Sequence, residues 1–318
     1  MQTNSSQIKT DSADKEKNNM TNQLVINWHI LEACNFHCKY CFAHWPQDKC
    51  SKEIWRSPEF SRKLLEELKN LPSHVPGNWG RIRLNIAGGE PMLLQQKGHL
   101  ERVFHLATNM GFDLSMISNG YKMDDEFIKK WAPNLQILGI SVDSARSDTN
   151  DKIGRKTESG KQISAERVGE IFRMARRHNP DIECKLNTVV SSANQREDMR
   201  SFVKSVSPDR WKIFKMLPIA NTMEIADKQV LFKITDKQFQ HFLDKHEELA
   251  DIMSPEDNDA MTESYLMVDP LGRLYQNTPA NGNYKHVVSK PIHIVGAAEA
   301  FKQIKFSGEK FALRYKTN

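Results

Sequence analysis

The chain has 318 residues, of which 39% are hydrophobic, so it is long enough for one large α/β barrel or two ordinary domains. Its 45 Lys and Arg residues against 40 Asp and Glu residues give a net charge of +5. These charges alternate in sign along the predicted helix faces, which gives no indication of nucleic-acid binding, and no apolar run is long enough to span a membrane.

The N-terminal segment, residues 1–21, is rich in Ser, Asn, Lys, Asp and Gln and has almost no apolar side chains. We expect it to be a disordered leader. It lacks the apolar core of a signal peptide and the amphipathic stripe of a helix that binds a membrane surface. The sequence therefore predicts a cytoplasmic protein without membrane attachment, whose thiols stay reduced.

Between residues 22 and 218, apolar β-rich segments alternate with helical patterns. The predicted strands are 24–30, 81–87, 113–117, 135–142, 182–190 and 210–217, and the predicted helices are 58–68, 100–109, 124–131, 165–178 and 195–206. This succession predicts a parallel sheet with helices outside it. Six units cannot close an eight-stranded barrel, so we expect an α/β fold with a partial (β/α)6 barrel. Chemistry in such barrels lies at the C-terminal ends of the strands.

Residues 219–318 break this alternation. Segment 235–250 predicts a helix with a capping-box arrangement near Thr235. Segments 265–268 and 273–275 flank the turn Asp269-Pro270-Leu271-Gly272, which predicts a hairpin. We expect this region to be a C-terminal extension that forms a lid over the mouth of the barrel. The predicted division is thus a leader (1–21), a barrel (22–218) and an extension (219–318).

Three cysteines follow the first predicted strand in a C-x3-C-x2-C run: Cys34, Cys38 and Cys41. Three thiolates at this spacing can bind three irons of a [4Fe–4S] cluster and leave the fourth iron open, whereas ferredoxin-type carriers use four cysteines per cluster. An open iron can chelate S-adenosylmethionine, which the reduced cluster can cleave to a 5′-deoxyadenosyl radical. The run therefore predicts a radical-SAM centre.

A zinc site and a disulfide framework are the two alternatives to an iron–sulfur cluster for these cysteines. Cys50, His37 or His44 could give zinc a fourth ligand, but the asymmetric spacing suits a zinc site poorly. A disulfide framework does not fit a long chain with five cysteines and no secretory signal. Cys50 and Cys184 are most simply structural or incidental thiols.

Polar residues follow the next three predicted strands. Gly88, Gly89 and Glu90 end the second, and the two glycines would let the backbone approach a ligand closely. The residues at the ends of the third and fourth strands are Ser118, Asn119 and Ser141, with Arg155 shortly afterwards. Taken singly, each could be an ordinary turn residue. Together they are typical of a barrel mouth, where an arginine could pair with the carboxylate of a cofactor.

Charged and amide side chains also occur inside predicted strands, where buried apolar residues are the rule. Residues two apart share a strand face, and four such pairs are Asn27 with His29, Arg83 with Asn85, Lys185 with Asn187, and Arg210 with Lys212. If these faces point inward, they form a cation-rich cavity suited to a triphosphate. In the alternative interpretation, they lie at strand starts or face solvent.

From about residue 22 to the C-terminus, the sequence resembles the viperin family, in particular its prokaryotic members. The matching stretches include Asn27-Trp28-His29, the cysteine run, Leu84 to Pro91, Ile117 to Gly120, Ile140 to Ser144, Ile153 to Arg155, Lys185 to Asn187, Ser207 to Phe214, and Asp259 to Asp269. The cysteine run and Gly-Gly-Glu-Pro are general to radical-SAM enzymes. The last three stretches discriminate viperins.

The resemblance implies a lyase that converts a ribonucleoside triphosphate (CTP, UTP or GTP) to its 3′-deoxy-3′,4′-didehydro form, an antiviral chain terminator. It implies that the cysteines bind the cluster and that Gly88, Gly89, Glu90, Ser118, Asn119, Ser141 and Arg155 bind S-adenosylmethionine. It further implies that Arg83, Lys185, Arg210 and Lys212 bind the triphosphate, while Asn27, Asn85 and Asn187 face the sugar and base.

The implied reaction removes the 4′-hydrogen and releases the 3′-hydroxyl as water, with an electron and a proton to complete the product. Lys185 or Tyr265 could deliver a proton or hydrogen. The implied partners are an electron donor such as flavodoxin or ferredoxin and the iron–sulfur assembly machinery.

The chain also departs from the vertebrate members of the family. The leader cannot form their membrane helix, the chain ends Arg314-Tyr315-Lys316-Thr317-Asn318 in place of an aromatic tail, and Ala87 replaces a serine. Two other classes remain open: another radical-SAM maturase, acting on a peptide or small molecule, and a zinc-dependent interaction module. No cysteine follows Cys184, which disfavours a maturase with auxiliary clusters.

Overall fold

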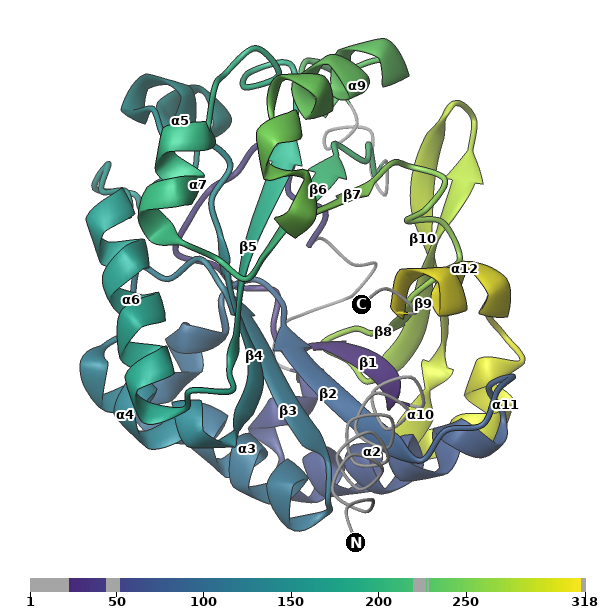
Figure 1. Cartoon of the computed structure of the whole chain (residues 1–318). Helices are drawn as coiled ribbons and strands as arrows, with labels where there is room; N and C mark the ends of the chain where they lie inside the picture. The colour runs from purple at the N-terminus through teal and green to yellow at the C-terminus, as the bar shows by residue number, and fades with distance from the viewer. Residues whose placement is uncertain (1–22, 44–51, 220–226, 228, 316–318) are drawn as a thin grey trace, which may run out of the picture.

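The computed structural model describes residues 23–43, 52–219, 227 and 229–315. The predicted leader, Cys50 and His44 lie outside these residues. The described part contains one ten-stranded sheet in the order β10-β9-β8-β1-β2-β3-β4-β5-β6-β7. Its first six strands are β1 (Gln23–His29), β2 (Arg81–Ala87), β3 (Asp113–Ser118), β4 (Leu135–Ser141), β5 (Glu183–Val190) and β6 (Arg210–Lys215). They pair in parallel and in chain order, which confirms the expected α/β fold with an open, partial barrel (Figure 1).

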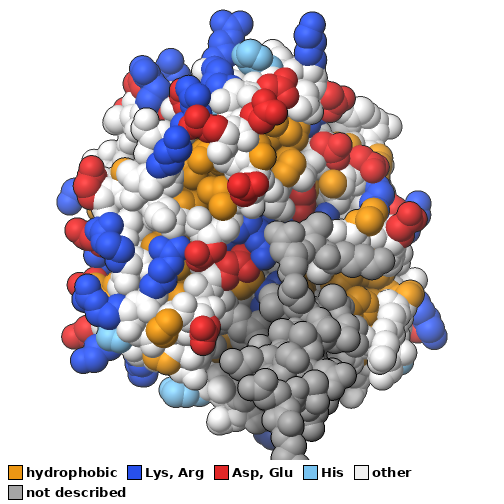
Figure 2. Space-filling view, in the orientation of Figure 1, with side chains coloured by type: hydrophobic (Ala, Val, Ile, Leu, Met, Phe, Trp, Pro, Cys, Tyr) orange, Lys and Arg blue, Asp and Glu red, His pale blue; other side chains and the backbone are white. Residues whose placement is uncertain are grey.

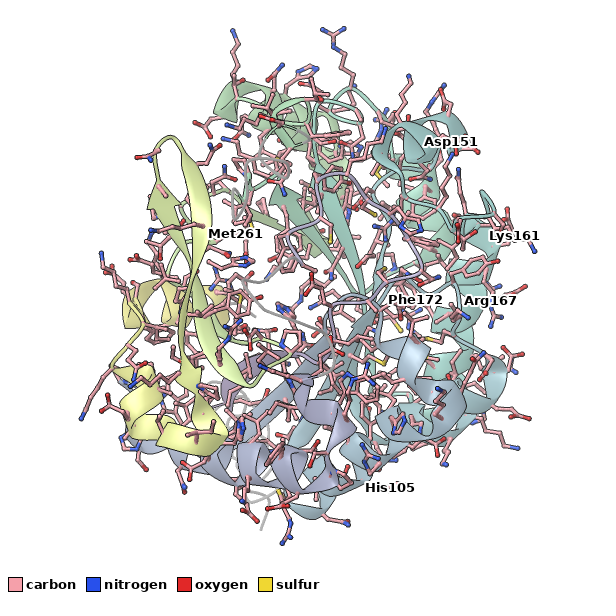
Figure 3. The ribbon with its side chains drawn as sticks, turned by 180° about the vertical axis from the view of Figure 1, so that it is seen from behind. His105, Asp151, Lys161, Arg167, Phe172 and Met261 are labelled. Atoms are coloured by element: carbon pink, nitrogen blue, oxygen red, sulfur yellow. The ribbon has the colours of Figure 1, made fainter. Side chains whose placement is uncertain are left out.

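Helices cover the outside of the parallel strands (Figure 1). They are α2 (Pro58–Asn70), α3 (His99–Asn109), α4 (Asp125–Trp131), α5 (Ser147–Ile153), α6 (Ala165–His178) and α7 (Arg200–Val206). In α6, Val168, Ile171 and Phe172 recur at helical spacing and are fully buried. Arg167 and the loop residue Lys161 lie on the outer side (Figure 3). This apolar stripe explains why α6 forms where the sequence predicts it.

Short 3-10 segments connect several elements. They are η2 (Ile54–Arg56), η3 (Leu71–Ser73), η4 (Pro91–Lys97), η5 (Ala132–Asn134) and η6 (Glu247–Ile252). No helix in the described ranges is long and apolar enough to cross a membrane. On the face shown in Figure 2, basic and acidic side chains are interspersed, as their alternation in the sequence indicates.

The C-terminal third extends the same sheet. It adds four strands to the sheet: β7 (Met253–Glu256), β8 (Leu266–Val268), β9 (Arg273–Ala280) and β10 (Asn283–Pro291). It also contains the helices α9 (Asp236–Lys245), α10 (Ile292–Val295), α11 (Ala297–Phe301) and α12 (Gly308–Tyr315). β7 pairs with β6, and β8 pairs with β1, both in parallel. The β8–β9 hairpin is antiparallel, as predicted. The sequence did not predict β7, β10, α5 or the helices after β10.

Most predicted helices agree with the structure within two residues, but two differ by more. The predicted helix 195–206 begins only at Arg200, because the carboxamide of Asn194 donates to the carbonyls of Asp143 and Val189 and holds the preceding segment in a turn. The predicted helix 235–250 ends at Lys245, since His246 has non-helical backbone angles. Its capping box at Thr235 is present as predicted.

Candidate active site

The loop that carries the three cysteines follows β1 and is fixed by its own backbone. The amide of Gly89 donates to the carbonyl of Leu31 at 2.7 Å, and the amide of Glu90 donates to that of Ala33 at 2.9 Å. On the other side, the amide of His37 donates to the carbonyl of Gly154 at 3.1 Å. The Gly-Gly-Glu segment and the α5 terminus therefore hold the loop from two directions.

Glycine is required where these segments meet. A Cβ added to Gly89 would lie 2.1 Å from the carbonyl oxygen of Ala33, a backbone atom that cannot move aside. A Cβ on Gly154 would lie 2.4 Å from the carbonyl oxygen of His37, and Gly154 also has a φ of +82°. These glycines serve the packing of the cysteine loop, in addition to any contact with a ligand.

The three thiols are partly buried and have only weak partners. Amide donors lie 3.3 Å from the Sγ of Cys34 and 3.4 Å from the Sγ of Cys41. Burial raises the pKa of Cys38 to about 12 and that of Cys41 to about 11. These sulfurs become thiolates when a cation compensates the cost of burying their charge, so the donor set fits an iron–sulfur cluster.

Zinc would require these side chains to converge on one point. In the ranges that the structure describes, no three His, Cys, Asp or Glu side chains are placed to hold a single metal ion. A tetrahedral zinc site needs four ligands around one ion, whereas each cysteine of a [4Fe–4S] cluster binds a different iron.

Glu90 lies fully buried between the cysteine loop and the end of β3. Its carboxylate accepts from the hydroxyl of Ser118 at 2.7 Å, the amide of Asn119 at 2.7 Å and the amide of Met92 at 3.0 Å. Asn119 also donates to the Sγ of Cys34 at 3.8 Å. Glu90, Ser118 and Asn119 thus form one network beside the cysteines, although none of the three lines the cavity described below. Their direct contact with the cofactor stays a prediction.

Arg155 links the cysteine loop to the ends of β4 and β5. Its guanidinium forms a buried ion pair with Asp143 at 2.9 Å and also donates to the carbonyl of Ser141. It lies 3.8 Å from the Sγ of Cys38, and its Nε is buried without a partner. An orphaned donor beside the cysteines is consistent with an anionic group of a cofactor at this place.

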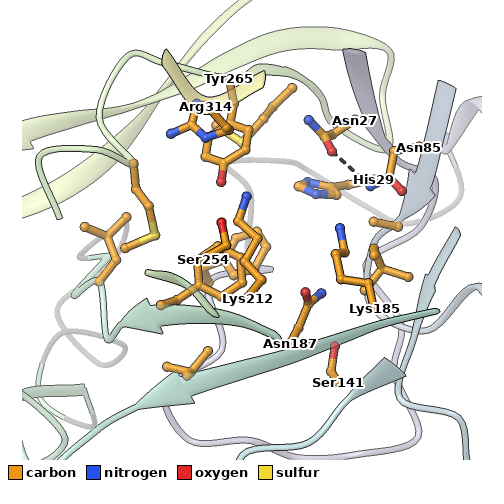
Figure 4. Close-up of a pocket in the computed structure, with 18 of the residues that line it drawn as sticks. Asn27, His29, Asn85, Ser141, Lys185, Asn187, Lys212, Ser254, Tyr265 and Arg314 are labelled. Carbon is orange, nitrogen blue, oxygen red and sulfur yellow. Dashed lines mark hydrogen bonds between the residues drawn. The ribbon is translucent and has the colours of Figure 1, made fainter. Parts of the chain in front are cut away.

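A cavity of about 300 Å³ opens beside this loop. Cys38, Cys41, Ser141 and Arg155 line one part of it, and all the predicted substrate residues line it as well: Asn27, Arg83, Asn85, Lys185, Asn187, Arg210 and Lys212. Tyr265 also faces it. Figure 4 shows side chains from β1, β2, β5 and β6 pointing into the same space. The predicted inward strand faces therefore meet in one cavity. Cys34, Gly88 and Gly89 lie outside its lining.

The cations of the cavity fall into two kinds. Lys212 pairs with Glu256 at 2.6 Å, and Arg210 pairs with Glu183 at 2.7 Å. Arg83 and Lys185 have no ion pair within the described part of the chain. Burial and the nearby Lys212 lower the pKa of Lys185 to about 7. Because burial disfavours the charged forms of Arg83 and Lys185, an anionic ligand that pairs with them would be favoured.

Amide groups occupy the wall nearest β1. Asn85 donates to the carboxamide oxygen of Asn27 at 2.9 Å and accepts from the hydroxyl of Ser115 at 3.0 Å. The carboxamide oxygen of Asn187 is buried without a partner. These amides can orient a polar ligand, and Asn187 offers it a free acceptor.

Comparisons with known proteins identify the family of the chain. A model of the radical SAM superfamily matches residues 28–206. Proteins described as S-adenosylmethionine-dependent nucleotide dehydratases match most of the chain: one from Psychrobacter lutiphocae is 39% identical over 92% of this chain and 95% of its own length. Another, RSAD2 of Danio rerio, is 30% identical over 91% of this chain and 76% of its own length. The chain belongs to this dehydratase family, the viperins.

Solved structures show the same fold. The enzyme anSMEcpe with bound AdoMet superposes with a TM-score of 0.61 at 16% identity, covering 92% of this chain and 83% of that one. Coproporphyrinogen III oxidase (HemN) from Escherichia coli, a radical SAM enzyme, has a TM-score of 0.51 at 11% identity, covering 83% and 70%. As a radical SAM enzyme, the viperin-family chain uses the predicted cofactors, a [4Fe–4S] cluster and S-adenosylmethionine.

The sequence did not reveal every residue of the viperin site. Arg314 and Tyr315 of α12 and Met261 of the loop before β8 line the cavity; Met261 lies beside the β9–β10 hairpin in Figure 3. The guanidinium carbon of Arg314 lies 3.6 Å from the centre of the Tyr265 ring. The only sequence signal was a basic and an aromatic residue near the end of the chain, which does not indicate where α12 docks.

Proposed function

We propose that this chain dehydrates a ribonucleoside triphosphate, CTP, UTP or GTP, to its 3′-deoxy-3′,4′-didehydro analogue, which terminates viral (phage) polymerase products. The observation that carries the proposal is one cavity lined by two cysteines of the cluster loop and by the unpaired cations Arg83 and Lys185. A polyanionic triphosphate would supply the missing counter-charge. The nucleotide class follows from membership of the dehydratase family.

The cofactors would occupy the mouth of the barrel beside the cysteine loop. Cys34, Cys38 and Cys41 would hold the cluster, and Gly88, Gly89, Glu90, Ser118, Asn119, Ser141 and Arg155 would form the S-adenosylmethionine site. The reduced cluster and bound S-adenosylmethionine would together supply a 5′-deoxyadenosyl radical. The buried Arg155–Asp143 pair would fix the guanidinium toward the cofactor's carboxylate.

The substrate would extend from this mouth along the strand faces. Arg83, Lys185, Arg210 and Lys212 would bind phosphate oxygens, and Asn27, Asn85 and Asn187 would orient the sugar and base. Lys185 and Tyr265 line the same cavity, so either could donate the proton with which the 3′-hydroxyl leaves as water. One electron from an external donor, such as flavodoxin or ferredoxin, would complete the product.

The proposed cluster chemistry also indicates the cellular compartment of the protein. Cluster thiolates persist where thiols stay reduced, so we place the enzyme in the cytoplasm, where iron–sulfur assembly machinery would load it. The division into leader (1–21), barrel (22–218) and covering extension (219–318) is part of this proposal. Arg314 and Tyr315 in the cavity wall support a covering role for the extension.

The test is an anaerobic assay of cluster-reconstituted protein with S-adenosylmethionine and dithionite, offering each ribonucleoside triphosphate in turn. Mass spectrometry would follow 5′-deoxyadenosine and a nucleotide that has lost one water. We expect dehydrated product from one triphosphate, which would also identify the substrate. Cofactor cleavage without any dehydrated nucleotide would refute the proposed substrate class and redirect the search to another radical-SAM reaction.

A further inference from the structure

A wall of charged side chains separates the active-site cavity from a second hollow of about 790 Å³ on the side of β7 and α12. Arg210, Ser254 and Arg314 line both spaces. Tyr265 and Lys212 line only the active-site cavity, whereas Glu256, at the end of β7, lines only the second hollow. Glu256 therefore contacts the cavity through other side chains.

Three side chains of the cavity meet on the carboxylate of Glu256. Lys212 of β6 lies 2.6 Å from its Oε1, and the Nε of Arg314 from α12 lies 2.7 Å away. The hydroxyl of Tyr265 donates to its Oε2. The side chains of Glu256, Lys212 and Arg314 are 7%, 10% and 5% exposed, so this cluster is shielded from water.

The cluster restricts what Tyr265 can do. A tyrosine hydroxyl has one proton, and in the empty cavity Tyr265 donates it to Glu256, which fixes the orientation of the hydroxyl at the cavity wall. The two cations Lys212 and Arg314, acting against the effect of burial, lower the pKa of Glu256 to about 2, so its carboxylate stays ionised. The same cations lie 5.3 Å and 3.6 Å from the centre of the Tyr265 ring, so both also contact it through cation–π interactions.

We infer that Glu256 is a positioning residue for the dehydration, which acts by fixing the hydroxyl of Tyr265 and the ammonium of Lys212 in the cavity wall. This inference rests on the proposed function. Its carboxylate neutralises charge on Lys212 and Arg314, so binding of the triphosphate depends mainly on the unpaired Arg83 and Lys185. Loss of Glu256 should therefore impair the step after radical formation more than it impairs substrate binding.

The experiment compares Glu256→Gln, Tyr265→Phe and the double variant in the anaerobic assay, after iron content and thermal unfolding have been measured. For Glu256→Gln we expect kcat to fall by at least about tenfold, and the ratio of 5′-deoxyadenosine to dehydrated nucleotide to rise by at least about threefold. We expect KM for the triphosphate to change by less than about threefold. If Glu256 acts through Tyr265, the double variant should be within about twofold of Tyr265→Phe alone.

Glu256→Asp guards against a variant that does not fold, because it keeps the charge but cannot reach all three partners; we expect an intermediate product ratio. Asp251→Asn removes one negative charge from the lining of the second hollow and should match the wild type. A wild type that forms no dehydrated nucleotide would overturn the proposed function. A productive wild type with an unchanged product ratio in Glu256→Gln and Glu256→Asp, or with additive effects in the double variant, would overturn the role of Glu256.

Discussion

The cysteine loop and the cation-lined cavity are adjacent but are built in different ways. The loop is held by backbone hydrogen bonds and by glycines that exclude a Cβ, and its position depends on the segments at Gly89 and Gly154. The cavity is built from side chains on separate strands, and two of its cations, Arg83 and Lys185, are left without an ion pair in the described residues. The backbone of the first region is held by contacts within the protein, whereas the second region would gain its missing counter-charge from the proposed ligand.

This comparison implies two kinds of sensitivity. Changes in the loop should abolish cofactor assembly in an all-or-none manner, because there is little room for a shifted backbone. Changes in the cavity should reduce affinity by graded amounts, because several cations share one polyanion. The following predictions test this distinction.

The largest expected effect is that of Cys38→Ala. If Cys38 is one of the three cluster ligands, as we propose, its loss should abolish cluster binding and all formation of 5′-deoxyadenosine. Iron and sulfide analysis with an assay of the cofactor product measures this. Cys184→Ala is the matched control, since Cys184 is buried against α6 and away from the site; it should retain the cluster. Residual 5′-deoxyadenosine formation by Cys38→Ala would disprove the ligand assignment.

Gly89→Ala should be nearly as severe. The added Cβ would lie 2.1 Å from the carbonyl oxygen of Ala33, so the cysteine loop must shift. Overpacking of this kind costs about 1–3 kcal/mol, and we expect iron content to fall by at least about fivefold, as judged by the cluster absorbance. Gly80→Ala is the control, because nothing lies within 4 Å of its added Cβ. Full cluster loading of Gly89→Ala would show that the loop is not held as described.

Arg83→Ala should leave cluster assembly intact and weaken the binding of the triphosphate. A lost charge-assisted contact is worth about 1.5–3 kcal/mol, or roughly ten- to hundred-fold in affinity. Isothermal titration calorimetry on the cluster-loaded protein measures this. Arg81→Ala, on the exposed start of the same strand and paired with Asp113, should bind normally. Equal affinities in the two variants would remove Arg83 from the triphosphate site.

The smallest effect concerns pH and Lys185, whose pKa is lowered from 10.5 to about 7 by burial and the nearby Lys212. A bound triphosphate favours the charged amine, so affinity should fall as pH rises above 7, by at most roughly tenfold per unit. In the free protein, the unfolded state binds more protons between pH 7 and 10.5, so the free energy of unfolding should increase with pH there.

Lys185→Met should flatten both slopes. Titrations between about pH 6.5 and 8.5 and denaturant melts across the higher range measure them. Any slope that persists unchanged in Lys185→Met would have to be assigned to another group, such as the nucleotide itself.

The parts predicted from sequence were those with local signals. Strand 81–87 and helix 165–178 were predicted to the residue, because apolar periodicity and caps such as Ser164 define them locally. The two-residue period of a strand predicted that Arg83 shares a face with Asn85 and Lys185 a face with Asn187. It left open whether these faces point inward, and in the structure they line the cavity.

The missed parts depend on tertiary contacts. β7 has four residues, Met253–Glu256, with a proline among them, and its pairing with β6 cannot be read from so short a segment. Arg314 reaches the cavity only because α12 docks against the end of β7 and the loop that follows it, where Arg314 contacts Glu256 and Ser264. The termination of α9 before His246 likewise depends on a distant group, since the His246 ring accepts from the amide of Met199.

The position of β8 beside β1 has a consequence for how the protein is made. Ile26 on the first strand pairs with Leu266, so one edge of β1 has no β8 partner until most of the chain has left the ribosome. Contacts of such long sequence separation slow folding, and an unpaired strand edge exposes a nascent chain to aggregation. Synthesis rate and chaperone supply should therefore influence the yield of active enzyme.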